Sequence, residues 1–164
     1  MIKFFCVLIG FSVILAGCKK TSTSVGGCRY VPSIYVADTA EVTVLKAWIN
    51  ANHPGAKKDI NGFYYEIIAP GAGDSAKLCS GIIIKYTGTL ISPSPGFKFD
   101  ENLVGISFTL GQLILGWQKG IPLIKPGGII NLYIPPSLGY GSAGSGIIPG
   151  NAYLNFNVQL LAVQ

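Results

Sequence analysis

The side chains in this sequence that could do chemistry form an aromatic and aliphatic set with a single carboxylate. They are Tyr86, Phe99, Asp100, Trp117, Tyr140, Ile148 and Phe156. Aromatic rings bury well and hold apolar groups, while a tyrosine hydroxyl and a carboxylate can direct polar contacts. If these side chains meet, they would form an apolar pocket that holds a ligand without making a bond to it. The competing interpretation, in which each aromatic only fills the core, stays open at this point.

Other motifs in the sequence do not support a different chemistry. Residues 139–144 fit the pattern G-x-G-x-x-G, but residues 145–150 cannot open the helix that a dinucleotide site requires. His53 stands at the end of a predicted helix, where a capping histidine is commoner than a catalytic base. Asp100 and Glu101 are adjacent and would face opposite ways on a strand, so they do not form a glycosidase pair. We predict no metal site and no cofactor, since the histidine and the cysteines are too few for zinc.

Trp117 decides how the pocket would be built. It lies on a short predicted helix, Leu113–Lys119, between a strand that ends at Leu110 and one that begins near Gly128. An indole on so short a helix has to point into the interior. Trp117 is therefore either core filler or the floor of the pocket.

The rest of the sequence predicts a sheet of short strands. Twenty-two glycines and ten prolines, together with many Val, Ile, Tyr and Phe residues, favour tight turns and antiparallel strands over a helical bundle. The predicted strands are Gly62–Ile68, Leu78–Leu90, Ile106–Leu110, Gly128–Pro135 and Tyr153–Val163, the last of which alternates apolar and polar residues. A longer helix is predicted at Asp38–Asn52, where Val42, Leu45, Trp48 and Ile49 recur at helical spacing. One helix on one face of an antiparallel sheet is an α+β arrangement.

The N-terminus carries features of an export signal. Residues 1–17 combine a positive start with an apolar run too short to span a bilayer, which indicates a secretory signal peptide. Leu15-Ala16-Gly17-Cys18 resembles the lipobox of bacterial lipoproteins, which implies that Cys18 carries a lipid and tethers the chain to a membrane. An ordinary cleavage site before a stray cysteine is the alternative. We expect residues 18–37 to be the lipidated tether and leader, 38–61 the helix and linker, and 62–164 the main domain.

Export also bears on the remaining cysteines. Cys6 leaves with the signal and Cys18 would carry the lipid, so Cys28 and Cys79 are left in an oxidising compartment, where we expect them to form a disulfide. We expect the bridge to pin the N-terminal helix and its leader over the outer face of the strand Leu78–Leu90. The formal net charge of +5 comes from scattered lysines without interleaved aromatics, so we predict no nucleic-acid partner.

Six strings of residues follow one another in a specific order in the second half of the chain. They are Ile84–Gly88, Phe97–Asp100, Phe108–Gly111, Ile114–Gly120, Ile134–Gly141 and Ile147–Ala152. On these strings the chain, from about Gly62 to the C-terminus, resembles the FKBP-type peptidyl-prolyl cis-trans isomerases. The resemblance implies a strongly curved antiparallel sheet of about five strands wrapped around one short helix, with the N-terminal helix as an extension.

The resemblance also assigns roles to residues. It implies that catalysis depends on Asp100, Tyr140, Trp117 and Phe99, with Trp117 as the pocket floor. It implies that the substrate is bound by Tyr86, Leu113, Ile114, Ile148 and Phe156. The Asp100 carboxylate, the Tyr140 hydroxyl and the N–H of Ile114 would be the polar contacts. Phe156 lies in the inward stripe that alternation alone predicts.

Three departures from the family pattern bear on affinity. Residues 101–105 lack the arginine that some family members place after the Phe-Asp pair, and Ile106 stands where an aromatic wall residue is common. The flap Ser142–Gly146 contains only small residues. By the resemblance, we expect a wider pocket and weak binding of macrolide-type inhibitors.

The resemblance and the export signal together predict the function. We expect a membrane-tethered peptidyl-prolyl cis-trans isomerase that acts on proline-containing polypeptides in the cell envelope and helps them to fold. Lys19 after the lipidated cysteine implies the outer membrane, facing the periplasm. The alternatives are a binding or chaperone module that uses the same pocket with little or no turnover, and a purely structural envelope lipoprotein.

Overall fold

A six-stranded antiparallel sheet forms the centre of the structure, a computed structural model that describes residues 28–164. The elements are α1 (Thr39–Asn52), β1 (Lys57–Lys58), β2 (Tyr64–Ala69), β3 (Gly81–Ser92), β4 (Lys98–Thr109), the 3-10 turn η1 (Leu110–Gln112), α2 (Leu115–Gly120), the 3-10 turn η2 (Ile121–Leu123), β5 (Ile129–Ile134), the 3-10 turn η3 (Pro136–Leu138) and β6 (Tyr153–Val163). The strand order is β1-β2-β5-β6-β3-β4. The predicted signal peptide and Cys18 lie outside the described residues.

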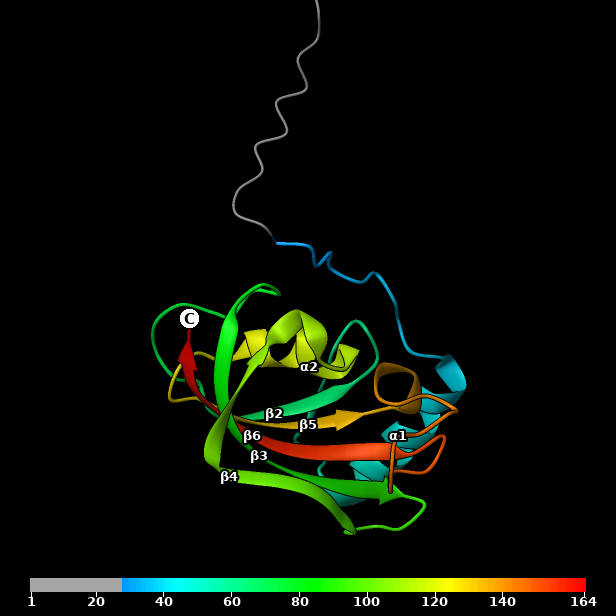
Figure 1. Cartoon of the computed structure of the whole chain (residues 1–164). Helices are drawn as coiled ribbons and strands as arrows, with labels where there is room; N and C mark the ends of the chain where they lie inside the picture. Colours follow the sequence, from blue (N-terminus) through cyan, green and yellow to red (C-terminus); the bar gives the residue numbers. More distant parts are fainter. Residues whose placement is uncertain (1–27) are drawn as a thin grey trace, which may run out of the picture.

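The two long central strands place the core on the side of the sheet that faces α2. Ile82, Ile84 and Tyr86 of β3 are buried, as alternation along the strand requires. On β6 the buried residues are Leu154, Phe156, Val158 and Leu160. The sheet curves around α2, which lies above it in Figure 1. The predicted α+β fold is confirmed, and the sixth strand is the two-residue β1 in the linker after α1.

The N-terminal helix α1 packs on the opposite side of the sheet. Asp38 caps it by accepting a hydrogen bond from the N–H of Ala40 at 2.7 Å, as Asp at a helix start is expected to do. Leu132 and Ile134 of β5 face the core, so Tyr133 between them points outward. On the outer face the ring of Tyr133 meets that of Trp48, with centroids 5.8 Å apart, and Tyr133 is fully buried. The helix therefore covers the outer face at β5.

This position corrects one expectation from the sequence. The helix and leader were expected to cover the outer face of β3, but α1 packs on β5 and on the turn after it, where Glu41 accepts hydrogen bonds from Ser137. Packing α1 on this face removes the large ring of Tyr133 from water, which favours the position. His53 caps the end of α1 by donating its backbone N–H to the Ile49 carbonyl. The centroid of the His53 ring lies 4.7 Å from that of Tyr133.

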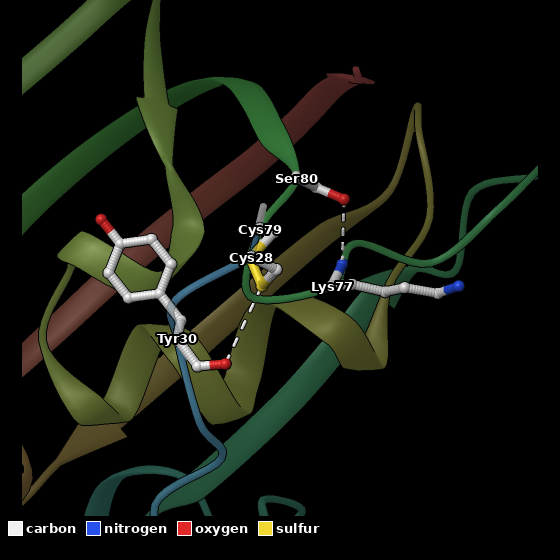
Figure 2. Close-up of a disulfide and its surroundings, with 5 residues drawn as sticks. All are labelled: Cys28, Tyr30, Lys77, Cys79 and Ser80. Carbon is white, nitrogen blue, oxygen red and sulfur yellow. Dashed lines mark hydrogen bonds between the residues drawn. A yellow bond between two sulfur atoms is a disulfide. The ribbon is translucent and has the colours of Figure 1, made fainter. Parts of the chain in front are cut away.

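A disulfide joins the leader to the turn before β3. It links Cys28 to Cys79, the pair expected from the sequence, with Cα atoms 5.5 Å apart (Figure 2). The leader then crosses the outside of α2, where the Lys119 ammonium donates to the Ser33 carbonyl at 2.6 Å. Within residues 28–164, no helix is long and apolar enough to cross a membrane.

Candidate active site

A cavity of about 210 Å³ lies between α2 and the strands β3, β4 and β6. Its lining consists of Tyr86, Asp100, Phe108, Leu113, Ile114, Trp117, Tyr140 and Phe156. Seven of these eight residues are among the site residues predicted from the sequence, and Phe108 is the addition. The strands, the turn between η1 and α2, and the segment after η3 each contribute a wall. The cavity thus joins parts of the chain that lie far apart in sequence.

Trp117 lies on the floor of this cavity and is 5% exposed. Its ring meets Tyr86 and Phe156 edge to face, with centroids 5.2 Å and 4.9 Å away. Such edge contacts are favourable for aromatic quadrupoles and hold the indole in one orientation. Helix α2 can approach the sheet this closely because Gly116 has no side chain, since a Cβ there would lie 2.6 Å from Ile134 Cδ1.

Two predicted residues lie beside the lining rather than in it. Phe99 packs edge to face on Phe156, with centroids 5.4 Å apart, and so supports a wall from behind. Gly88 lies between these two rings, and a Cβ there would come within 2.6 Å of Phe99. Ile148 is buried at the end of the flap, although it does not line the cavity.

The polar groups of the cavity are coupled to one another. The Tyr86 hydroxyl donates to Asp100 Oδ2 at 2.5 Å, which fixes the carboxylate at the cavity wall. Burial raises the pKa of Tyr86 above its ordinary value, and the hydrogen bond to Asp100 raises it further, because both disfavour the phenolate. Burial also raises the pKa of Tyr140, and the negative charge of Asp100 adds to this effect. Both phenols therefore stay protonated donors at neutral pH.

Two N–H groups in the cavity wall have no partner among the described residues. The indole N–H of Trp117 is buried without an acceptor. The backbone N–H of Ile114, at the N-cap of α2, makes no hydrogen bond to any residue of 28–164. An unsatisfied buried donor costs about 1–3 kcal/mol and is usually found where a ligand or water completes it.

Phe108 is a lining residue that the sequence reasoning missed. Ile106 and Phe108 are two positions apart on β4 and therefore share a face, opposite Ile84 and Ile82 on β3. The family resemblance places Ile106 at the position of an aromatic wall residue, whereas the aromatic side chain that lines the cavity is Phe108, two residues further along β4. Alternation along the predicted strand Ile106–Leu110 would have been the signal.

A second and larger space lies outside this set. It has a volume of about 330 Å³ and lies between the leader and α2, lined in part by Pro32, Lys119 and Pro122. The ammonium group of Lys119 in this space already donates hydrogen bonds to the Ser33 carbonyl at 2.6 Å and to Asn61 Oδ1 at 2.9 Å. We take the cavity at Trp117 as the candidate site, because aromatic walls, a carboxylate and free donors converge there. Among the described residues, no cluster of three or more His, Cys, Asp or Glu side chains could hold a metal ion.

Comparisons with known proteins identify relatives of this chain. FkpA of Escherichia coli K12 is 39% identical over 117 residues, which cover 70% of this chain and 42% of FkpA. Mip of Coxiella burnetii is 37% identical over 119 residues, which cover 70% of this chain and 50% of Mip. The chain therefore spans half or less of the length of these relatives.

Solved structures give the same result. The crystal structure of Escherichia coli FkpA matches with a TM-score of 0.67 and 35% identity, over 76% of this chain and 58% of that one. A peptidyl-prolyl cis-trans isomerase from Pseudomonas syringae matches with a TM-score of 0.66 and 26% identity, over 78% of this chain and 97% of that one. The family model described as FKBP-type peptidyl-prolyl cis-trans isomerase matches residues 73–161, more than half of the sequence. The chain belongs to the family of FKBP-type peptidyl-prolyl cis-trans isomerases.

Proposed function

We propose that this protein catalyses the cis-trans isomerisation of X-Pro bonds, and that the cavity floored by Trp117 is where it does so. The observation that carries the proposal is the convergence of seven predicted side chains, from β3, β4, β6, α2 and the segments beside them, on one cavity. Family membership supports the same reaction.

The reaction needs little covalent help from a protein. Rotation about an X-Pro bond breaks amide resonance against a barrier of about 20 kcal/mol. An apolar surface disfavours the polar planar amide relative to the twisted, less charge-separated one. Contacts that hold the twisted form better than either planar isomer lower the barrier, and about 5 to 8 kcal/mol of such preference gives roughly four to six decades of rate.

Each lining residue then has a role in the proposed reaction. The proline ring rests on Trp117, between the rings of Tyr86 and Phe156. The free N–H of Ile114 donates to a peptide carbonyl on one side. Tyr140 and the Asp100 carboxylate provide the directed polar contacts on the other.

An isomerisation assay on a short X-Pro peptide, by coupled proteolysis or NMR exchange, tests the proposal. Asp100→Ala is expected to lower kcat/KM by roughly ten- to hundredfold, by analogy with the loss of one directed contact in other active sites. Trp117→Ala is compared with Trp48→Ala, which truncates the other indole on the opposite side of the sheet. Only the Trp117 variant should lose activity. A wild type at the uncatalysed rate removes the enzymatic function, and an active Trp117→Ala removes the site.

A binding or chaperone module with little turnover is the second candidate. The flap at residues 142–146 favours it, since its small side chains offer little to grip a twisted bond. In that case the wild type would bind a proline-containing peptide and suppress aggregation of a client without accelerating isomerisation. Weak binding of macrolide-type inhibitors stays a prediction. Phe108 supplies an aromatic wall near Ile106, and titration with a macrolide measures whether binding is weak despite this wall.

We further propose that the protein works outside the cytoplasm, tethered through Cys18 to the outer membrane and acting on exported polypeptides. The Cys28–Cys79 disulfide supports the compartment, because such bridges persist in oxidising surroundings. The lipobox-like residues before Cys18 support the anchor. Mass spectrometry of the mature protein and of Cys18→Ser is the test. A wild-type mass without acyl chains removes the anchor but leaves the isomerase intact.

A further inference from the structure

The leader lies outside the residues that match the family, yet it touches the segment that carries one wall of the cavity. The ring of Tyr30 lies against the backbone of Gly111 in η1. A Cβ on Gly111 would be 2.3 Å from Tyr30 Cγ and 2.7 Å from each Cδ, so the contact exists only because residue 111 is a glycine. Tyr30 is partly buried by this contact.

Gly111 is also held at its other backbone groups. Its N–H donates to the Leu78 carbonyl at 2.7 Å, and its own carbonyl accepts from Gln118 Nε2 at 3.2 Å. The same amide of Gln118 donates to the Leu113 carbonyl at 2.7 Å. With the Tyr30 ring on its Cα, Gly111 is fixed from three sides. The chain has little freedom between this point and the cavity wall at Leu113 and Ile114.

The disulfide keeps Tyr30 in place. Cys28 is two residues before Tyr30, and its partner Cys79 lies between Leu78 and Ser80, whose carbonyls accept from the N–H groups of Gly111 and Leu110. Figure 2 shows the bridge with the Tyr30 ring near it. The bridge thus joins the leader to the segment that is hydrogen-bonded to η1, and the Tyr30 ring has a short tether to its contact surface at Gly111.

We propose that Tyr30 is a positioning residue of the active site. Held by the Cys28–Cys79 bridge, its ring fixes Gly111 and, through it, the Leu113 side chain and the free N–H of Ile114. The inference rests on the proposed function, because it takes the cavity at Trp117 as the substrate site. Tyr30 is not among the residues that line the cavity, so its effect on catalysis acts through η1.

The test compares Tyr30→Ala, Tyr30→Phe and Tyr35→Ala in the full chain. Tyr35 is the matched control, since it is a leader tyrosine, 46% exposed, with no side-chain hydrogen bond among the described residues. Tyr30→Ala should lower kcat/KM by roughly three- to tenfold, because small displacements of a binding wall are costly. Most of the change should be in KM, since the wall contacts the peptide throughout the reaction. Tyr30→Phe and Tyr35→Ala should behave like the wild type, because the contact is made by the ring of residue 30.

A second measurement serves if the alanine variant folds poorly. In the wild type, reduction of the bridge should raise KM and speed hydrogen exchange at the amides of Gly111 and Leu113. The double variant Cys28→Ser/Cys79→Ser should do the same, and adding Tyr30→Ala to it should cause no further loss, since both act through one contact.

Three outcomes overturn the inference. The first is a folded Tyr30→Ala protein with the wild-type KM. The second is an equal loss of kcat/KM in Tyr35→Ala. The third is reduction of the bridge without effect on either KM or hydrogen exchange. These failures are distinct from failure of the site itself. If Trp117→Ala is inactive while Tyr30→Ala is normal, the cavity stands and only the role of Tyr30 falls.

Discussion

The hydrogen bond between Tyr86 and Asp100 offers a direct test of how the cavity orients its carboxylate. Tyr86→Phe removes the hydroxyl that donates to Asp100 Oδ2 at 2.5 Å and leaves the ring against Trp117 and Phe156. The substitution therefore changes one polar contact without opening a hole in the core.

The expected cost in stability is modest. A hydrogen bond to a charged group contributes about 1.5–3 kcal/mol when its partner is left buried. Residue Asp100 is exposed, so water replaces the lost donor, and we expect a loss of about 1–2 kcal/mol in the free energy of unfolding by urea. The expected loss in kcat/KM is roughly five- to twentyfold, corresponding to about 1–2 kcal/mol of transition-state stabilisation from an oriented carboxylate.

Tyr133→Phe is the matched control on the other face of the sheet. The Tyr133 hydroxyl donates to Glu66 Oε2 at 2.6 Å, so this variant loses the same kind of bond, with a similar or larger cost in stability. Because Tyr133 lies under α1 and away from the cavity, its kcat/KM should stay at the wild-type value. Equal losses of activity in both variants, or full activity in Tyr86→Phe, would refute the reasoning that Tyr86 orients a working carboxylate.

Three further predictions concern stability. Gly88→Ala pushes a methyl group between the ring of Phe156, which lines the cavity, and the ring of Phe99 behind it. It should cost about 1–3 kcal/mol in urea unfolding, with a raised KM; an unchanged denaturation midpoint would contradict the packing. The raised pKa of Tyr86 keeps its hydroxyl protonated in the folded chain, while the same hydroxyl in the unfolded chain ionises near pH 10. The contribution of this hydroxyl to the free energy of unfolding is therefore complete below pH 10. It is lost as pH rises further, at about 1.4 kcal/mol per pH unit. The slope of stability against pH above 10 should therefore be shallower in Tyr86→Phe than in the wild type. The Cys28–Cys79 bridge joins residues 51 positions apart, so its reduction should lower the free energy of unfolding by roughly 4 kcal/mol on the chain-entropy estimate. The loss is measured as a lower melting temperature in dithiothreitol. Two thiols that label without reductant would show that the bridge is absent.

The parts of the fold that could be predicted are those where local pattern and tertiary packing agree. The strand Tyr153–Val163 has the predicted bounds, because its alternation reports one buried face. Helix α1, Thr39–Asn52, lies within the predicted range Asp38–Asn52, since Asp38 can satisfy the free N–H groups of a first turn. The convergence of the cavity residues followed from resemblance rather than from local pattern, because no periodicity within one element relates Asp100 to Trp117 or Tyr140.

The parts that could not be predicted depend on pairing between distant segments. The strand predicted at Ile106–Leu110 covers only the last third of β4, which begins at Lys98 and ends at Thr109. Its first half is polar and largely exposed, and it is held as a strand by the ladder to β3 rather than by its own propensity. The place of α1 over Tyr133 likewise depends on which outer surface is most apolar.

The N-terminal extension contacts, at two places, segments that lie next to cavity-lining residues. Tyr30 lies on the turn before Leu113, and Glu41 of α1 accepts from the Ser137 N–H and hydroxyl at 3.0 Å and 2.5 Å. Ser137 is in η3, three residues before Tyr140, so a carboxylate from outside the matched region stabilises the turn that presents the phenol. Packed elements transmit displacement because interiors are dense and resist compression. The geometry of the cavity is therefore a property of the extension and the curved sheet together, although every lining residue belongs to the sheet, α2 and their connections.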